Sequence, residues 1–133
     1  MNPSDNLPFT AVPSHAALLE TCYASAYQAL QSYDLCSAQR LFGVIAAMAV
    51  RDERAWIGLA VVRERKEQWH AAAGLYGVAT AFVPDSAWCH FGKGRNLMRL
   101  GRVSEAEESF ANAESLSSDP QLLRALAEER GQS

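Results

Sequence analysis

The residue types that most often do chemistry in a site are few in this sequence. The candidate metal ligands and nucleophiles are three histidines and three cysteines: His15, His70, His90, Cys22, Cys36 and Cys89. The histidines fall in three separate segments, and no C-x-x-C or H-E-x-x-H spacing occurs. Cys89 and His90 are adjacent, but on a helix their side chains would point about 100° apart, which disfavours joint chelation. We therefore predict no metal site and no cofactor.

Motifs of enzyme catalysis are also missing from the sequence. It contains no G-x-S-x-G motif and no complete phosphate-binding glycine loop. Gly92-Lys93-Gly94 comes nearest to such a loop, but it lacks the preceding residues of that motif and falls inside a predicted helix. The chain is accordingly predicted not to be an enzyme.

Charge and apolar pattern narrow the classes of partner. The net charge of -3 argues against nucleic acid as the main partner. No apolar run approaches the roughly 20 residues of a membrane span, so no stable membrane insertion is expected. The N-terminus has no basic start followed by an apolar core, and the odd number of cysteines shows no pairing pattern. These features predict a cytoplasmic protein with free thiols, and a redox regulator that uses those thiols stays a minor alternative.

A repeat organises the rest of the chain. The stretch 53–86 closely follows the 34-residue tetratricopeptide (TPR) pattern. Its matching residues are Trp56, Leu59, Ala60, Ala72, Tyr76, Ala79 and Pro84. A shift by one repeat in either direction keeps the residue types: small residues recur at 26, 60 and 94, alanines at 38, 72 and 106, and aromatic rings at 42, 76 and 110. Three repeats follow, at about 19–52, 53–86 and 87–120.

These recurrences predict an all-α TPR helical solenoid of three helix-turn-helix repeats plus a C-terminal capping helix at about 120–130. Small residues let paired helices approach, and the ring four residues after each alanine fills the space beyond the contact. A single TPR domain is expected over 14–133, after an irregular N-terminal arm at 1–13. Local signals add three expectations: Ser14 caps the first helix, Gly101 ends the fifth in a left-handed conformation, and Ser104 with Glu107 forms a capping box.

The first helix of each repeat lines the concave side of such a solenoid. Eight of the twelve residues expected to project there are apolar or aromatic, which predicts a groove for an extended peptide with apolar anchors. The predicted groove residues are Tyr23, Tyr27, Leu30, Ile57, Val61, Trp88, Phe91, Arg95 and Met98. Alternatively, the N-terminal arm, the last helix or a second copy of the chain covers this surface, so a homodimer is a further expectation. Alanine at both Tyr27 and Phe91 is expected to abolish peptide binding without loss of helix.

The sequence resembles the TPR chaperones of bacterial type III secretion that serve hydrophobic translocator proteins. The likeness is carried by RAWIGLAVVRERKEQWHAAAGLYGVATAFVPDS (54–86) and by LGRVSEAEESFANA (100–113). Gly58-Leu59-Ala60 is similar to the family's G-L-G-A run. The carboxylate clamp of heat-shock co-chaperones is absent, because its positions hold Tyr23, Tyr27, Trp88 and Gly92.

The resemblance implies a cytosolic chaperone without ATPase activity. It would bind an extended segment of one or two secreted translocators in the groove, and so keep them soluble before export. A generic TPR adaptor or scaffold in a larger assembly, binding through its convex face or capping helix, is the alternative.

Overall fold

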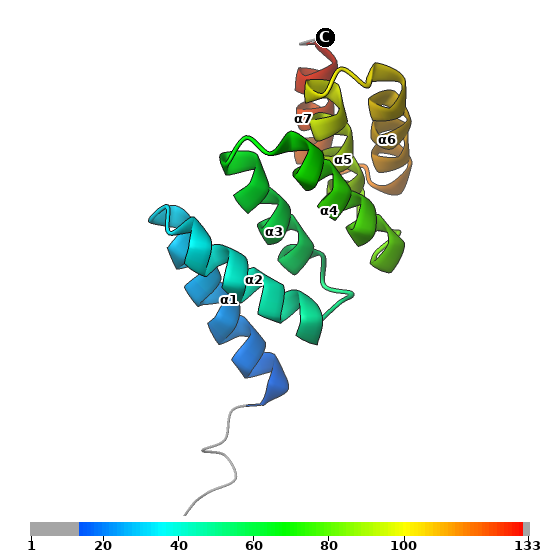
Figure 1. Cartoon of the computed structure of the whole chain (residues 1–133). Helices are drawn as coiled ribbons and strands as arrows, with labels where there is room; N and C mark the ends of the chain where they lie inside the picture. Colours follow the sequence, from blue (N-terminus) through cyan, green and yellow to red (C-terminus); the bar gives the residue numbers. More distant parts are fainter. Residues whose placement is uncertain (1–13, 132–133) are drawn as a thin grey trace, which may run out of the picture.

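The computed structural model describes residues 14–131, which form seven α-helices and no strand (Figure 1). The helices are α1 (His15–Gln31), α2 (Leu35–Met48), α3 (Glu53–Arg65), α4 (Trp69–Phe82), α5 (Ala87–Arg99), α6 (Val103–Leu116) and α7 (Pro120–Gly131). The expected arm at 1–13 lies outside the described residues. The first six helices pair as α1–α2, α3–α4 and α5–α6, one pair within each predicted repeat.

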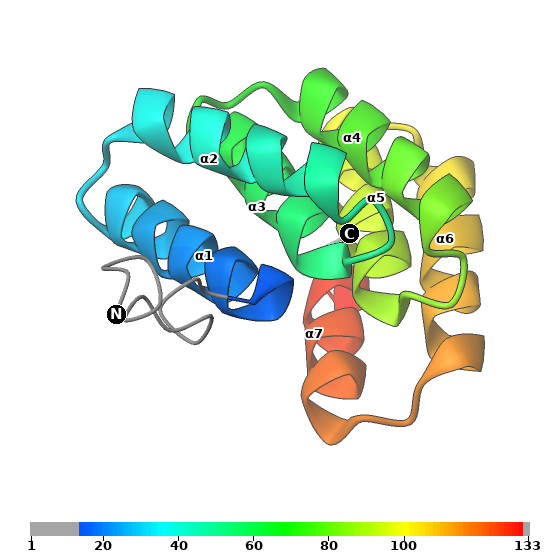
Figure 2. The same ribbon diagram turned by 90° about the horizontal axis from the view of Figure 1, so that it is seen from below.

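The pairs stack into a curved array of two layers. Figure 2 shows α2, α4 and α6 along the outer side, with α1, α3, α5 and α7 on the inner side. Each outer helix also packs against the first helix of the following pair, and α7 packs against α5 and α6. The apolar face of each pair is therefore buried by its neighbour, as a repeat architecture requires.

The turn inside each pair has the same backbone conformation. Tyr33, Glu67 and Gly101 occupy equivalent positions and have positive φ angles of 61°, 56° and 77°. The following backbone N–H bonds back to the helix: Asp34 to Ala29 at 2.9 Å, Gln68 to Arg63 at 2.9 Å and Arg102 to Leu97 at 3.0 Å. This is the Schellman pattern. The left-handed cap predicted at Gly101 is confirmed, and the two earlier repeats adopt it with a residue that carries a side chain.

Helix starts agree with one capping prediction and contradict the other. Ser14 caps α1, because its hydroxyl accepts from the backbone N–H of Ala17 at 3.1 Å. The capping box at Ser104 is wrong: α6 already begins at Val103, and Arg102 at its N-cap makes no side-chain cap bond. The Schellman turn before it fixes the start of α6 at the same register as α2 and α4, one residue before Ser104.

Aromatic rings from the outer helices form the joints between repeats. Phe42 and Tyr76 are buried, and the ring of each packs against a glycine of the next repeat. A Cβ atom added to Gly58 would lie 2.4 Å from the Phe42 ring, and one added to Gly92 would lie 2.3 Å from the Tyr76 ring. Backbone and ring thus meet at both joints, and the second joint lies at the candidate site.

Candidate functional site

A pocket of about 250 Å³ opens between α3 and α5 on the inner side of the array. Its lining is mostly apolar and consists of Ile57, Val61, Tyr76, Trp88, Phe91, Gly92 and Arg95. The structure therefore brings together five of the nine predicted groove residues. Tyr76 and Gly92 were not among the predicted groove residues: Tyr76 was assigned to packing inside its repeat, and Gly92 carries no side chain that could mark it as a groove residue.

Gly92 explains why Tyr76 reaches this pocket. Tyr76 belongs to the outer helix α4, but the absence of a side chain at Gly92 lets its ring pass beside the backbone of α5. The ring is nearly buried, and its hydroxyl lies 3.4 Å from a carboxylate oxygen of Glu64. Burial, and then the Glu64 carboxylate, raise the pKa of the Tyr76 hydroxyl, so it stays protonated and can donate at neutral pH.

Glu64 is the polar centre beside the pocket. Its side chain is only 10% exposed, and it accepts from Arg95 at 2.6 Å and from Asn96 at 3.1 Å. Burial alone would lower the pKa of Arg95, but the Glu64 carboxylate holds it above the ordinary value. Arg95, on α5, is thereby tied to α3, and its guanidinium lies 5.4 Å from the centre of the Phe91 ring.

The predicted groove residues of α1 form a separate group. The rings of Tyr23 and Tyr27 stack with centroids 6.0 Å apart, and Tyr27 is 41% exposed. Tyr23 and Leu30 are buried in the core that α1 shares with α2 and α3. The guanidinium of Arg54 lies 4.0 Å above the Tyr23 ring, held by Glu20 and Asp52. Of the three predicted residues, Tyr27 therefore offers most surface on this side.

Helix α7 covers the other end of the inner side. Met98 is half-buried and packs against the cluster that contains Leu122 and Leu126 of α7. Trp88 borders the apolar pocket and also a hollow of about 320 Å³ that it shares with α7. The last helix thus takes part of the surface that the sequence assigned to peptide binding, as one of the alternatives had anticipated.

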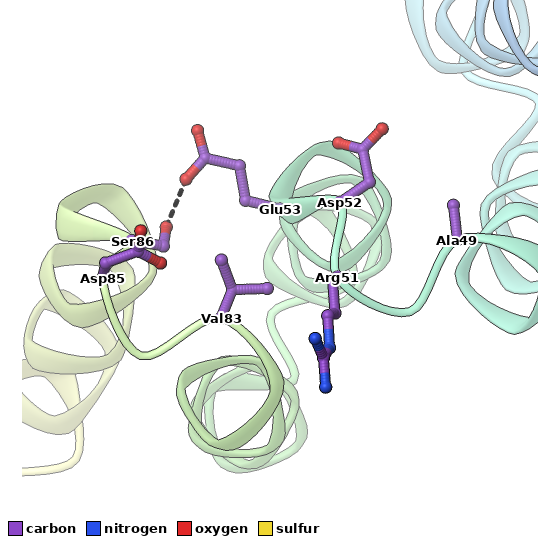
Figure 3. A pocket seen from close by; sticks show the side chains of 7 residues that line it. All are labelled: Ala49, Arg51, Asp52, Glu53, Val83, Asp85 and Ser86. Atoms are coloured by element: carbon purple, nitrogen blue, oxygen red, sulfur yellow. Dashed lines mark hydrogen bonds between the residues drawn. The ribbon is translucent and has the colours of Figure 1, made fainter. Parts of the chain in front are cut away.

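Another hollow, of about 540 Å³, lies where loops join the repeats (Figure 3). Three of its polar residues, Asp52, Glu53 and Ser86, already bond within the chain. Asp52 accepts from the backbone N–H of Arg54 at 3.1 Å, and the Ser86 hydroxyl donates to the Glu53 carboxylate across the joint. We interpret this hollow as part of the structural contact between the starts of α3 and α5, and not as a binding site.

The side chains that could do chemistry stay apart. Within residues 14–131, no group of three or more histidine, cysteine, aspartate or glutamate side chains could hold a metal ion. Cys36 is exposed, whereas Cys89 is buried, and this burial raises the pKa of its thiol to about 11. None of the helices in this part of the chain is long and apolar enough to cross a bilayer.

Comparisons with known proteins identify the fold. No protein-family model and no curated protein matches the sequence. The type III secretion translocator chaperone SycD of Yersinia enterocolitica is 22% identical, with 86% of each chain covered and a TM-score of 0.75. PcrH from Pseudomonas aeruginosa is 21% identical, with 94% of this chain and 95% of that chain covered and a TM-score of 0.76.

PcrH in complex with the chaperone binding region of PopB is similar at the same level. It is 21% identical, with 91% of this chain and 98% of that chain covered and a TM-score of 0.76. The predicted fold class is confirmed: the chain has the all-α, TPR-like fold of the type III secretion translocator chaperones.

Proposed function

We propose that this protein is a cytosolic type III secretion chaperone that binds an extended, apolar segment of a translocator protein. The binding site is the pocket between α3 and α5, extended toward Tyr27 of α1. The observation that carries this proposal is the apolar pocket on the inner side of a fold shared with chaperones solved together with translocator segments. Binding before export would keep the client soluble, and the proposal requires no catalytic step, metal or cofactor.

The pocket has the properties of an anchor site. Ile57, Val61 and Trp88 are half-buried, so each still has exposed apolar surface that a bound peptide could bury. Burial of apolar surface stabilises by about 25 cal/mol per Å², and a few anchors in a pocket commonly dominate the affinity for a peptide. The volume of about 250 Å³ suits one or two apolar side chains of the client.

SycD and PcrH support the choice of client. SycD has been solved in complex with a peptide of the translocator YopD, and PcrH with the chaperone binding regions of PopD and PopB. This chain shares their fold at low identity, so each translocator of its own secretion system is a candidate client to be tested in turn.

The test compares two aspartate substitutions that differ in their place on the array. Val61→Asp puts a carboxylate into the pocket, whereas Val44→Asp puts it on the outer side of α2, where Val44 is 55% exposed. Each variant is co-expressed with a candidate translocator, and the amount of translocator that co-purifies is measured. Circular dichroism checks that both variants keep the helix content of the wild type.

Val61→Asp is expected to co-purify at least tenfold less translocator, while Val44→Asp retains it. The carboxylate at position 61 removes apolar contact from the anchor site, and it can pair with the neighbouring arginines in place of the client. Equal retention by both folded variants would contradict the groove proposal. Substitution of Phe91 is a poorer test than the sequence suggested. Phe91 is 5% exposed and packs on Phe110, so Phe91→Ala should also destabilise the fold by about 3 kcal/mol or more.

The alternative function, a TPR adaptor, is favoured by exposed apolar side chains on the outer helices. Val44, Met48, Val78, Phe82 and Leu116 are all more than 40% exposed, and they recur at repeat spacing along α2, α4 and α6. An adaptor partner or a second copy of the chain would use this outer surface. This function would be supported if Val44→Asp failed to bind a partner that Val61→Asp still binds. It would also be supported if light scattering showed a dimer for Val61→Asp but not for Val44→Asp.

A further inference from the structure

A second hollow adjoins the apolar pocket and has a different chemistry. It has a volume of about 380 Å³ and shares two lining residues, Val61 and Arg95, with the apolar pocket. The rest of its lining comes from the ends of α3 and α5 and the start of α4: Glu64, Arg65, Trp69 and Arg99. A segment lying in the apolar pocket would therefore meet this hollow, which we call the basic pocket, as it continues along the groove.

Three guanidinium groups line the basic pocket against one carboxylate. Glu64 is engaged by Arg95 at 2.6 Å, and Arg99 approaches the same carboxylate only to 3.6 Å. Arg65 donates to the backbone carbonyl of Leu30 at 2.7 Å, which leaves its charge unneutralised. Among residues 14–131, no ion pair joins Arg65 to a carboxylate, and Glu64 is the only ion-pair partner of Arg99. Glu129 of α7 adds an attraction to Arg95.

The arginines are held ready for a ligand. The Arg99 side chain is 43% exposed, and its guanidinium lies 4.6 Å from the centre of the Trp69 ring, a cation–π contact that limits its rotamers. Arg65 lies 5.1 Å from the Tyr33 ring in the same way. Both residues end their helices, where a cation is favoured by the helix dipole. This placement stabilises the helices but does not cancel the local excess of positive charge.

This excess stands out because the chain as a whole is acidic, with a net charge of -3. A client segment without charge would leave three guanidinium groups around the basic pocket to share the one carboxylate of its lining, Glu64. An acidic side chain there would gain charge-assisted hydrogen bonds, and the planar guanidinium matches a carboxylate in shape. Charge complementarity therefore selects an acidic segment.

We infer that the basic pocket of Arg65, Arg95 and Arg99 binds an acidic side chain of the client, next to the apolar anchor in the pocket between α3 and α5. This inference rests on the proposed function and specifies the client sequence. Along α3, Ile57 of the apolar pocket and Arg65 of the basic pocket lie about 12 Å apart. Phe91 and Arg99 have the same separation along α5. An extended chain covers this distance in about three or four residues, so the acidic residue lies three or four positions from the anchor.

The experiment is a selection from a random decapeptide library displayed between folded flanks, so that neither peptide end is free. The full-length protein is the bait, at 50 mM NaCl. The variant Arg65→Gln/Arg99→Gln removes two charges from the basic pocket. The matched control Arg40→Gln/Arg51→Gln removes two charges from exposed positions elsewhere. The wild type and the control should enrich sequences with an aliphatic or aromatic anchor and an aspartate or glutamate three or four positions away, about fivefold over the input.

The pocket variant should retain the anchor preference and lose the acidic one. A synthetic enriched peptide should lose about tenfold in affinity when its glutamate becomes glutamine, and less at 500 mM NaCl because salt screens the pair. Enrichment of apolar anchors without an acidic residue would overturn this inference and leave the proposed function standing. No enrichment of apolar anchors by the folded wild type would overturn both.

Discussion

The joint between the first two repeats gives a sharp prediction about stability. A Cβ atom on Gly58 would lie 2.4 to 2.6 Å from three carbons of the Phe42 ring, far inside van der Waals contact. Phe42 is fully buried and packs against Tyr27, so its ring has no open space to enter. Overpacking of this kind costs about 3 kcal/mol, and the better helix propensity of alanine returns about 1 kcal/mol. Gly58→Ala should therefore destabilise the protein by about 2 kcal/mol.

Gly74 supplies the matched control for this substitution. It lies inside helix α4, is exposed, and has no atom within 4 Å of the position that a Cβ would take. Gly74→Ala should gain the propensity term alone and stabilise by about 1 kcal/mol. The two variants should thus differ by about 3 kcal/mol, or about 10 °C in Tm for a chain of this size.

Thermal unfolding followed by circular dichroism, with urea titration as a second measure, tests the pair of variants. The joint is correctly described if Gly58→Ala unfolds well below the wild type and Gly74→Ala slightly above it. If Gly58→Ala were as stable as Gly74→Ala, the Phe42 ring would not be confined by the backbone of α3, and our description of the joint would be refuted.

Three further predictions follow from other parts of the structure. Glu67→Gly should stabilise by about 1 kcal/mol in urea titration, because Glu67 has a positive φ angle that glycine adopts without strain; an unchanged midpoint would contradict this. Glu64→Ala should destabilise by about 2 kcal/mol in thermal unfolding, because it leaves the half-buried guanidinium of Arg95 without its carboxylate. Glu20→Ala, at an exposed ion pair, should lower the stability by under about 1 kcal/mol. If Glu64→Ala and Glu20→Ala lowered the stability equally, the network around Glu64 would be contradicted. At pH 8 a thiol reagent should modify Cys36 in the native protein but reach Cys89 only after unfolding, because Cys89 is buried and the pKa of its thiol is raised to about 11. Mass spectrometry of the modified peptides measures this. Rapid labelling of Cys89 in the native protein would contradict its burial.

Much of the fold was predictable because the repeat spacing is strict. Small residues and rings recur in one register, so the helix pairs could be placed from the sequence. The same register hides the left-handed turns, since only Gly101 carries the usual signal. Tyr33 and Glu67 adopt this conformation because their repeats have the same turn, and only comparison between repeats could have found them.

The candidate site was predictable where it depends on repeat position and less so where it depends on contacts between helices. Ile57, Val61, Trp88, Phe91 and Arg95 meet in one pocket because equivalent positions of stacked first helices converge. Tyr76 also reaches this pocket because Gly92, in the next repeat, has no side chain to block its ring. That contact joins two repeats and is not visible from one repeat alone. Covering of Met98 depends on where α7 docks, which the apolar stripe of that helix does not specify.

Site-directed photo-crosslinking shows directly which side of the array holds the client. A photoreactive amino acid replaces either Ile57, in the pocket between α3 and α5, or Val78, on the outer side of α4. Each variant is irradiated while bound to a co-expressed translocator, and the crosslinked peptides are identified by mass spectrometry. If the client binds the groove, position 57 crosslinks to one short apolar segment of the translocator and position 78 gives no crosslink. Crosslinks from position 78 alone would show that the client binds the outer side, and would contradict the proposed groove.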